Sequence, residues 1–236
     1  MIRRIGRLVR DSVRDIAGGL IAGLPGPTGR RLRRVWWGRR LAYLGPRVAI
    51  DEGVRIEGAE WISIGADTWI DRGVILLAGP PRPGRETRRL DNGNFAGRPG
   101  EMRLGARCHV GPYTILSAMG GLELGDEVTV SAGGRLYSLS HHYRSHARPH
   151  DRTIAFGSQT PDDRQALVAG PIVLGENVGL GADCLVLPGV SIGACSFVAP
   201  RSVVRRDLPA NTLAGGDPAE IRGPRFAEDD REERSR

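Results

Sequence analysis

Residues 174–203 decide the fold: they read LGENVG, LGADCL, VLPGVS, IGACSF and VAPRSV, five consecutive segments of six residues. An aliphatic residue opens every segment, and Val204 opens a sixth in the same phase. Neither the 3.6-residue period of a helix nor the alternation of a half-buried strand gives a period of six. A hexapeptide repeat is typical of a parallel β-helix, in which three segments form one triangular coil. The opening aliphatics are therefore expected to point inward and stack at a strand spacing of about 4.8 Å.

The same phase continues towards the N-terminus as far as Ile50. Inward-pointing aliphatics are expected at Ile50, Ile56, Ile64, Ile70, Leu76, Leu104, Val110, Leu116, Leu124, Val130 and Leu136. The six-residue step is interrupted after Ile56, Leu76, Leu116 and Leu136, where 2, 22, 2 and 32 extra residues are inserted. Each insertion follows the third segment of a coil, so all four leave from one corner of the triangle. Two long loops, 77–103 and 137–173, are thus predicted on one edge, and loops on a rigid scaffold often carry function.

The composition agrees with a narrow core and many corners. The 236 residues include 34 glycines, and 40% of the chain is hydrophobic with only 5% aromatic. The sequence has no run of 18 apolar residues and no secretory signal pattern, so we predict a cytoplasmic protein. Cys108 and Cys184 fall on small inward-pointing positions and are expected to be buried free thiols in a reducing compartment.

The positive charge of the chain is confined to its N-terminal part. The net charge is +7, and every basic residue is arginine. Residues 1–47 hold twelve arginines against Asp11 and Asp15, so the remainder is slightly acidic. A β-helix of this charge is not expected to bind nucleic acid.

Three domains are predicted. Residues 1–47 form a basic amphipathic helical segment, which the sequence Leu24-Pro25-Gly26-Pro27 breaks into two helices. This segment either caps the open first coil or lies on an anionic membrane through residues 1–40, and both roles can coexist. Residues 48–224 form the β-helix, and residues 225–236 form a charged tail that is expected to be disordered.

Histidines gather in the second long loop. Four of the five lie there, at positions 141, 142, 146 and 150, and His109 is the fifth. An imidazole with a pKa near 6.5 suits a general base at neutral pH. A cluster of this kind at the corner that bears the loops is the first candidate for chemistry.

Three stretches carry a resemblance to a known family. They are LGDEV through LYSLSH at 124–141, the repeat at 172–204, and RDLPAN followed by AGGDPA at 206–219. Over residues 45–224 the chain resembles the hexapeptide-repeat acyltransferases of the left-handed β-helix class. It is most similar to the galactoside and maltose acetyltransferases and to the sugar O-acetyltransferases of surface-polysaccharide gene clusters.

The resemblance implies an activity and a set of site residues. The expected enzyme is a homotrimer with sites between neighbouring subunits, and it transfers an acetyl group from acetyl-CoA to a hydroxyl of a sugar or surface-glycan precursor. The register of the family's catalytic histidine falls on His141, which would act as general base in a direct ternary-complex mechanism, with His142 and Tyr143 beside the acceptor. The implied CoA-binding residues are Gly181, Ala182, Ala199, Pro200, Arg205, Arg206 and Arg222.

The sequence departs from the family pattern at three positions. Gly179 stands where the family has a tryptophan that forms one wall of the site. Pro200 cannot donate an N–H in the small-residue segment of the CoA groove. Gly111 stands where several sugar-acetylating members carry asparagine, so the acceptor is not expected to be a galactoside in detail.

Two other functions remain open from the sequence. A zinc hydratase like the γ-class carbonic anhydrases would use three histidines, and His141, His146 and His109 have suitable spacing. A non-catalytic β-helix that serves as a scaffold is the second alternative, because of the departures at Gly179 and Pro200. The acetyltransferase interpretation needs no metal.

Overall fold

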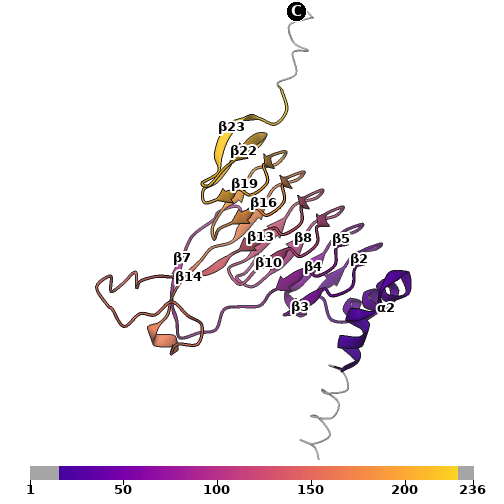
Figure 1. The fold of residues 1–236 in the computed structure, drawn as a ribbon, viewed down its shortest axis with the longest axis horizontal. Helices are drawn as coiled ribbons and strands as arrows, with labels where there is room; N and C mark the ends of the chain where they lie inside the picture. The colour runs from indigo at the N-terminus through magenta and orange to yellow at the C-terminus, as the bar shows by residue number, and fades with distance from the viewer. Residues whose placement is uncertain (1–15, 228–236) are drawn as a thin grey trace, which may run out of the picture.

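The computed structural model describes residues 16–227. Within this range the chain is a left-handed parallel β-helix, as predicted, whose coils stack between helix α2 and the terminal strands β22 and β23 (Figure 1). The three faces of the coil are parallel sheets, which we call A, B and C. The chain visits them in the order A, B, C in each coil, so the hexapeptide period corresponds to one strand and one corner.

Each sheet is a stack of short strands. Sheet A contains β1 (Tyr43–Leu44), β4 (Ile62–Ile64), β8 (Met102–Leu104), β11 (Leu122–Leu124), β16 (Ile172–Leu174) and β19 (Ser191–Ile192). Sheet B contains β2 (Ala49–Ile50), β5 (Trp69–Ile70), β9 (His109–Val110), β12 (Thr129–Val130), β17 (Gly179–Leu180), β20 (Phe197–Val198), β22 (Thr212–Gly215) and β23 (Glu220–Pro224). Sheet C contains β3 (Arg55–Glu57), β6 (Ile75–Leu77), β10 (Ile115–Ser117), β13 (Arg135–Tyr137), β18 (Leu185–Val186) and β21 (Val203–Val204).

The predicted inward-pointing residues form the core. Every one from Ile50 to Val204 is at most 4% exposed, except Ile56, which is half-buried at the N-terminal end of the stack. Cys108 and Cys184 are also buried in this core, and burial raises the pKa of both thiols. The period of six therefore identified the core correctly.

The β-helix begins one strand before the predicted start. Strand β1 pairs with β4, and Leu44 lies six residues before Ile50, in phase with the repeat. The expected domain boundary at residue 47 thus falls inside the first coil. Leu44 is only half-buried because no coil precedes it, and the flanking arginines hid the repeat there.

Glycine follows the inward residue of sheet A because successive coils approach closely at this corner. A Cβ atom added to Gly65 would lie 2.5 Å from the carbonyl carbon of Gly105, the equivalent position on the next coil. Glycine is required there for lack of space. The residue with positive φ at the same corner is not glycine but Asp67, Arg107 or Glu127 in successive coils, which the expectation of small residues at corners did not include.

The two long insertions leave from the corner between sheets C and A, as predicted, and we call this corner the loop edge. They are not plain loops, because they build a further three-stranded sheet D. It consists of β14 (Leu139–His142), β15 (Ala166–Ala169) and β7 (Glu86–Arg89), in the order β14-β15-β7. Two 3₁₀ helices, η1 (Ala59–Trp61) and η2 (Asp162–Arg164), lie at the same edge. In Figure 1 this insertion projects sideways from the stack.

Two helices cover the first coil. Residues 16–23 are helical, the chain breaks at Leu24 and Pro25 as predicted, and α2 (Gly26–Gly38) follows. Arg33 of α2 is fully buried, and its guanidinium donates to the carbonyl oxygens of Ile50 (2.8 Å) and Ile21 (3.1 Å), so it ties both helices to the coil. The predicted helix over residues 2–15 and the charged tail after residue 227 lie outside the described residues.

Candidate functional site

Sheet D places His141 on a defined face. His141 lies opposite Leu167 in the antiparallel pair of β14 and β15, and Leu167 lies opposite Thr87 in the parallel pair of β15 and β7. Directly opposed residues of a sheet project from the same face, and adjacent residues of one strand project from opposite faces. His141, Leu167 and Thr87 therefore share one face, and His142 belongs to the other.

The imidazole of His141 is half-buried against the second loop. Its ring meets the ring of Phe156 edge to face, with 5.8 Å between the centroids. Its Nδ1 atom is buried and has no hydrogen-bond partner among the described residues. A buried polar atom without a partner is costly, and this nitrogen stays unsatisfied within the described residues.

His142 and Tyr143, the predicted acceptor-binding residues, lie away from His141. The His142 ring stacks on Tyr143 and on His146, with centroid distances of 4.3 and 4.2 Å. Its Nδ1 atom lies 2.7 Å from the carbonyl oxygen of Arg144, to which it donates. One chain therefore does not bring these two residues together with His141 around one acceptor.

Glu86 of the first long loop holds the part of the second long loop that bears the histidines, residues 141–150, which we call the histidine loop. The sequence did not point to Glu86. Its carboxylate accepts the N–H groups of His146 (2.6 Å) and Ala147 (3.1 Å). Burial opposes the ionised form, but hydrogen bonds from Ser145 and from these two N–H groups outweigh it and lower the Glu86 pKa. Burial, and then the charge of His142, lower the pKa of His146. Only the pairing of β7 with β15, which no repeat predicted, brings Glu86 here.

The predicted CoA groove lies at another corner of the coil. Gly181 and Pro200 stack at the corner between sheets B and C, where a Cβ atom on Gly181 would lie 2.5 Å from the Pro200 nitrogen. The N–H groups of Gly181 and Ala199 donate to the carbonyl oxygens of Val198 and Ala214 on the next coil, at 2.8 Å each. Of these groove residues, which all lie in the described part of the chain, Ala182 alone keeps an N–H that donates to no described atom.

The three predicted phosphate-binding arginines differ in their partners. Arg205 pairs with Asp217 at 2.8 Å. Arg222 donates to the Gly215 carbonyl at 3.4 Å. Arg206 is exposed and makes no ion pair or hydrogen bond within residues 16–227, so it is the readiest of the three for an external phosphate.

Phe197 fills the place of the missing tryptophan. Gly179 and Phe197 are directly paired on β17 and β20. A Cβ atom added to Gly179 would lie 2.9 Å from Cδ2 of Phe197, so the ring of the next coil covers the glycine. The aromatic wall thus persists, displaced by one coil.

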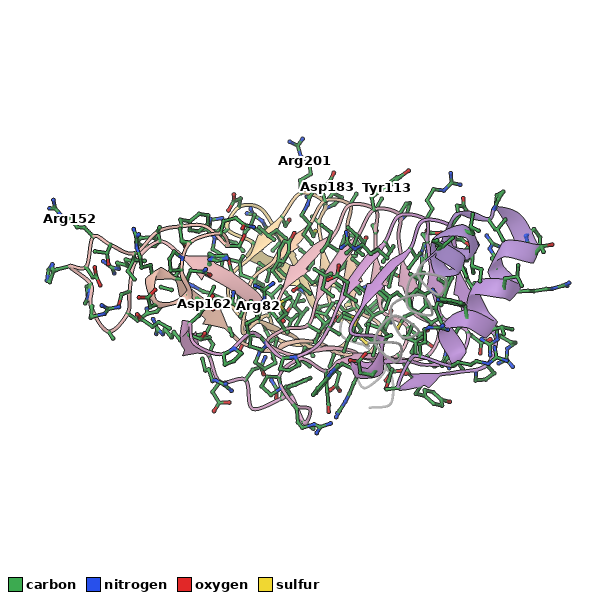
Figure 2. All side chains as sticks on the ribbon, turned by 90° about the horizontal axis from the view of Figure 1, so that it is seen from below. Arg82, Tyr113, Arg152, Asp162, Asp183 and Arg201 are labelled. Carbon is green, nitrogen blue, oxygen red and sulfur yellow. The ribbon has the colours of Figure 1, made fainter. Side chains whose placement is uncertain are left out.

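The loop edge and the B–C corner are at opposite ends of sheet C. Figure 2 shows Tyr113, Asp183 and Arg201 along the B–C corner, whereas Arg82 and Asp162 lie on the inserted loops away from it. A sheet C face of about five residues at about 3.3 Å each separates the two edges by roughly 15 Å. His141 and the groove residues are therefore not neighbours within one chain.

The three histidines of the zinc hypothesis do not meet in one chain. His109 lies on β9 in sheet B, where its Nε2 atom is 2.9 Å from a carboxylate oxygen of Asp71 and its ring tilts against Trp69. His141 and His146 belong to the loop edge and contact Phe156 and His142, respectively. Among residues 16–227, no three His, Cys, Asp or Glu side chains are grouped as a metal site would require.

The class defined by this architecture is the hexapeptide-repeat left-handed β-helix, and solved structures agree with it. The N-acyltransferase AntD from Bacillus cereus, solved as a D94N mutant with dTDP and coenzyme A, superimposes with a TM-score of 0.66 over 82% of this chain and 90% of its own, at 20% identity. The hexapeptide-repeat acetyltransferase VCA0836 from Vibrio cholerae, solved with acetyl coenzyme A, gives 0.54 over 92% of this chain and 89% of its own, at 22% identity. These identities establish the fold alone.

Curated relatives support the resemblance at the level of sequence. The chain is 32% identical over 123 residues to a protein of Escherichia coli K12 named "Putative colanic acid biosynthesis acetyltransferase WcaF". The aligned region covers 52% of this chain and 58% of that protein. The chain is 29% identical over 112 residues to "Putative lipopolysaccharide biosynthesis O-acetyl transferase WbbJ" of the same organism, covering 48% and 55%. The chain therefore spans little more than half the length of these relatives. No protein-family model matches the chain.

Proposed function

We propose that this protein is an acetyl-CoA-dependent acetyltransferase that modifies a hydroxyl of a sugar or surface-glycan precursor. The observation that carries the proposal is the position of His141 on a rigid strand at the loop edge of a β-helix that resembles acetyltransferases in sequence and fold. Similarity to proteins named for colanic acid and lipopolysaccharide biosynthesis supports a glycan acceptor.

His141 is assigned as the general base. Its Nδ1 atom is buried, so Nε2 is assigned as the nitrogen that takes the proton from the acceptor hydroxyl. The hydroxyl oxygen attacks the thioester carbonyl of acetyl-CoA, which supplies the acetyl group, and the proton passes from His141 to the departing thiolate. No bond to the enzyme forms in this sequence, and general-base catalysis typically contributes 10²–10⁴-fold to the rate.

The B–C corner fits the predicted CoA groove. Ala182 and Ala199 are small and partly exposed, the free Ala182 N–H can bind a carbonyl oxygen, and Arg206 has no internal partner for its guanidinium. Because this corner and His141 lie on different edges of one chain, we propose that the active site forms between neighbouring subunits of a homotrimer.

The test compares His141→Ala with its neighbour His142→Ala. Release of CoA thiol from acetyl-CoA, followed in the presence of glycan-precursor acceptors, is expected to fall at least about 100-fold in His141→Ala. His142→Ala is expected to stay within a few fold of the unmodified protein, because its side chain faces away from His141. Loss of turnover in His142→Ala alone would indicate that His142, and not His141, is the base. Unchanged turnover in both variants would refute the mechanism.

We further propose that the N-terminal helices contact an anionic membrane surface. No helix of the described residues is long and apolar enough to cross a bilayer. However, Leu20, Leu32 and Val35 are 68%, 42% and 53% exposed on the side away from the coil. Residues 16–50 contain seven arginines and no acidic residue; Arg33 is buried and Arg30 and Arg47 pair with Asp51 and Asp67, so the other four arginines are the ones that can meet anionic lipid.

Sedimentation with vesicles tests this contact. The full chain is expected to bind vesicles of phosphatidylglycerol and phosphatidylcholine, and to bind phosphatidylcholine alone at least about tenfold more weakly, because each surface arginine contributes about 1 kcal/mol near anionic lipid. Leu32→Ser with Val35→Ser should weaken binding, whereas Ile221→Ser, an exposed residue at the far end of the stack, should not. Equal binding by both variants would argue against the contact.

A further inference from the structure

The loop edge carries a basic pocket that the proposed chemistry does not yet use. It encloses about 710 Å³ between the first long loop and the coil, a size typical of small-molecule sites. Three arginines line it, Arg82, Arg85 and Arg89, and Asp91 is the one acidic residue among its described lining residues. Leu90, Phe95 and Met119 supply an apolar part of the wall.

The positive charge of this pocket is not compensated within the chain. None of the three arginine side chains forms an ion pair or a hydrogen bond with any of residues 16–227, although many other arginines of the coil are paired with carboxylates. The Nε atom of Arg85 is buried and has no partner there. A buried guanidinium N–H without an acceptor is costly, and charge-assisted bonds to phosphate or carboxylate are what this group forms best.

The pocket lies on the face of sheet D to which His141 belongs. Arg89 and Ala169, which both line the pocket, are directly paired. Thr87, also in the lining, pairs with Leu167, and Leu167 in turn pairs with His141. Two strand spacings of about 4.8 Å separate Thr87 from His141, so the base lies roughly 10 Å from the pocket wall. Leu167, which lies between them on this face, is fully buried, so a saccharide that spans this distance passes over the residues that cover Leu167.

We propose that this pocket binds a phosphate or diphosphate ester on the acceptor, so that the enzyme selects a phosphate-bearing saccharide. This assignment rests on the proposed function, because it takes His141 as the point where the acceptor hydroxyl reacts. Arg85 and Arg89 hold the anionic group, and the saccharide extends along the sheet towards His141. The apolar part of the wall receives the less polar face of the ligand.

The strand β7 offers a matched control. Arg88 is adjacent to Arg89 but projects from the opposite face, so it keeps the same charge and the same local sequence without entering the pocket. Arg85→Gln and Arg89→Gln are therefore compared with Arg88→Gln, and thermal unfolding of each variant verifies that the fold is retained.

Calorimetric titration with four probes tests the assignment without acetyl-CoA. Glucose 1-phosphate and inorganic pyrophosphate are expected to bind saturably, glucose at least about tenfold more weakly, and glucuronate between them, because a phosphate dianion carries more charge than a carboxylate. Arg85→Gln and Arg89→Gln should each raise the dissociation constant for glucose 1-phosphate about tenfold or more, and Arg88→Gln less than about twofold. Binding of glucose as tight as that of glucose 1-phosphate, tighter binding of glucuronate, or an equal loss in Arg88→Gln would overturn the proposal.

Failure of this inference can be told apart from failure of the proposed function. The titrations are repeated with His141→Ala and inorganic pyrophosphate, which fills the pocket without a saccharide to reach His141, so its dissociation constant should change less than about twofold. If acetyl transfer to neutral sugars proceeds while the phosphate probes do not bind, the pocket assignment is wrong and the enzyme assignment stands. If the probes bind as expected and no acceptor supports thiol release, the acetyltransferase assignment is wrong instead.

Discussion

At the scale of single residues, the two neighbouring histidines of β14 show what a strand does to a sequence motif. His141 and His142 are the same type of residue, but as neighbours in a pleated strand they project from opposite faces. His141 lies against Phe156 on the face of the basic pocket, and His142 lies against His146. The resemblance to the acyltransferases predicts that His141 is the base, and the alternation of the strand places the two rings on opposite faces, so variants of each can test that prediction separately. The orientation of the ring was beyond prediction, because Phe156 comes from a loop with no repeat.

Gly179 makes a testable case of compensation between coils. Its Cβ position would lie 2.9 Å from the Phe197 ring, so Gly179→Trp should overpack this face and destabilise the protein by about 1–3 kcal/mol. Combining it with Phe197→Gly removes the obstructing ring and should recover most of that loss. Chemical denaturation of the two single variants and the double variant measures the coupling between them. Strictly additive effects would show that the two side chains do not share the space.

At the scale of elements, prediction succeeded where the sequence repeats and failed where it does not. The phase of Ile50, Ile70 and Leu174 follows from local spacing, because each inward residue needs an equivalent one coil away. Sheet D lacks such a period. The pairing of β7 with β15 joins segments about 80 residues apart, and Glu86 reaches His146 only through that pairing.

The histidine loop held by sheet D should respond to acid. Burial and the charges of His142, Arg88 and Arg144 lower the His146 pKa, and Glu86 opposes them only in part. The folded state therefore binds fewer protons here than the unfolded chain, so His146 contributes stability that is present above its unfolded pKa of about 6.5 and is lost as the pH falls through its folded value. Glu86, whose pKa is also lowered, adds a loss in the same direction at lower pH.

The pH effect can be measured directly. Thermal unfolding between pH 7.5 and pH 5 is expected to show falling stability, with lower hydrogen-exchange protection factors at residues 145–147. His146→Phe keeps a ring for stacking on His142 but cannot take the proton, so its decline over the same interval should be smaller. A decline as steep as that of the unmodified protein would place the acid-sensitive group elsewhere.

At the scale of the whole molecule, the triangular coil separates the two halves of the proposed site. His141, the proposed base, lies at the loop edge, and the candidate groove residues Ala182 and Pro200 lie at the B–C corner, next in sequence to Asp183 and Arg201, which Figure 2 shows. The groove residues belong to the stacked coil, whereas His141 belongs to sheet D, which leaves the coil at the other end of sheet C. In the proposed homotrimer, a head-to-tail ring of three chains would bring the loop edge of one copy to the B–C corner of the next.

Complementation between inactive variants tests this arrangement. His141→Ala removes the base, and Ala182→Trp should block the groove, so each variant alone is expected to be inactive. In mixed trimers from equal coexpression, a site between subunits is intact when its base comes from an Ala182→Trp chain and its groove from a His141→Ala chain. Random assembly makes about a quarter of the sites intact, so about a quarter of the unmodified activity should return.

The double variant supplies the control. Coexpressed with the unmodified chain, a chain carrying both substitutions leaves about a quarter of the sites intact if they form between subunits, and about half if each site lies within one chain. The two experiments must agree, because both follow from the same separation of the edges. No recovered activity in the first experiment, together with half in the second, would place base and groove on a single chain and require His141 to reach the B–C corner of its own coil, which the length of sheet C does not permit.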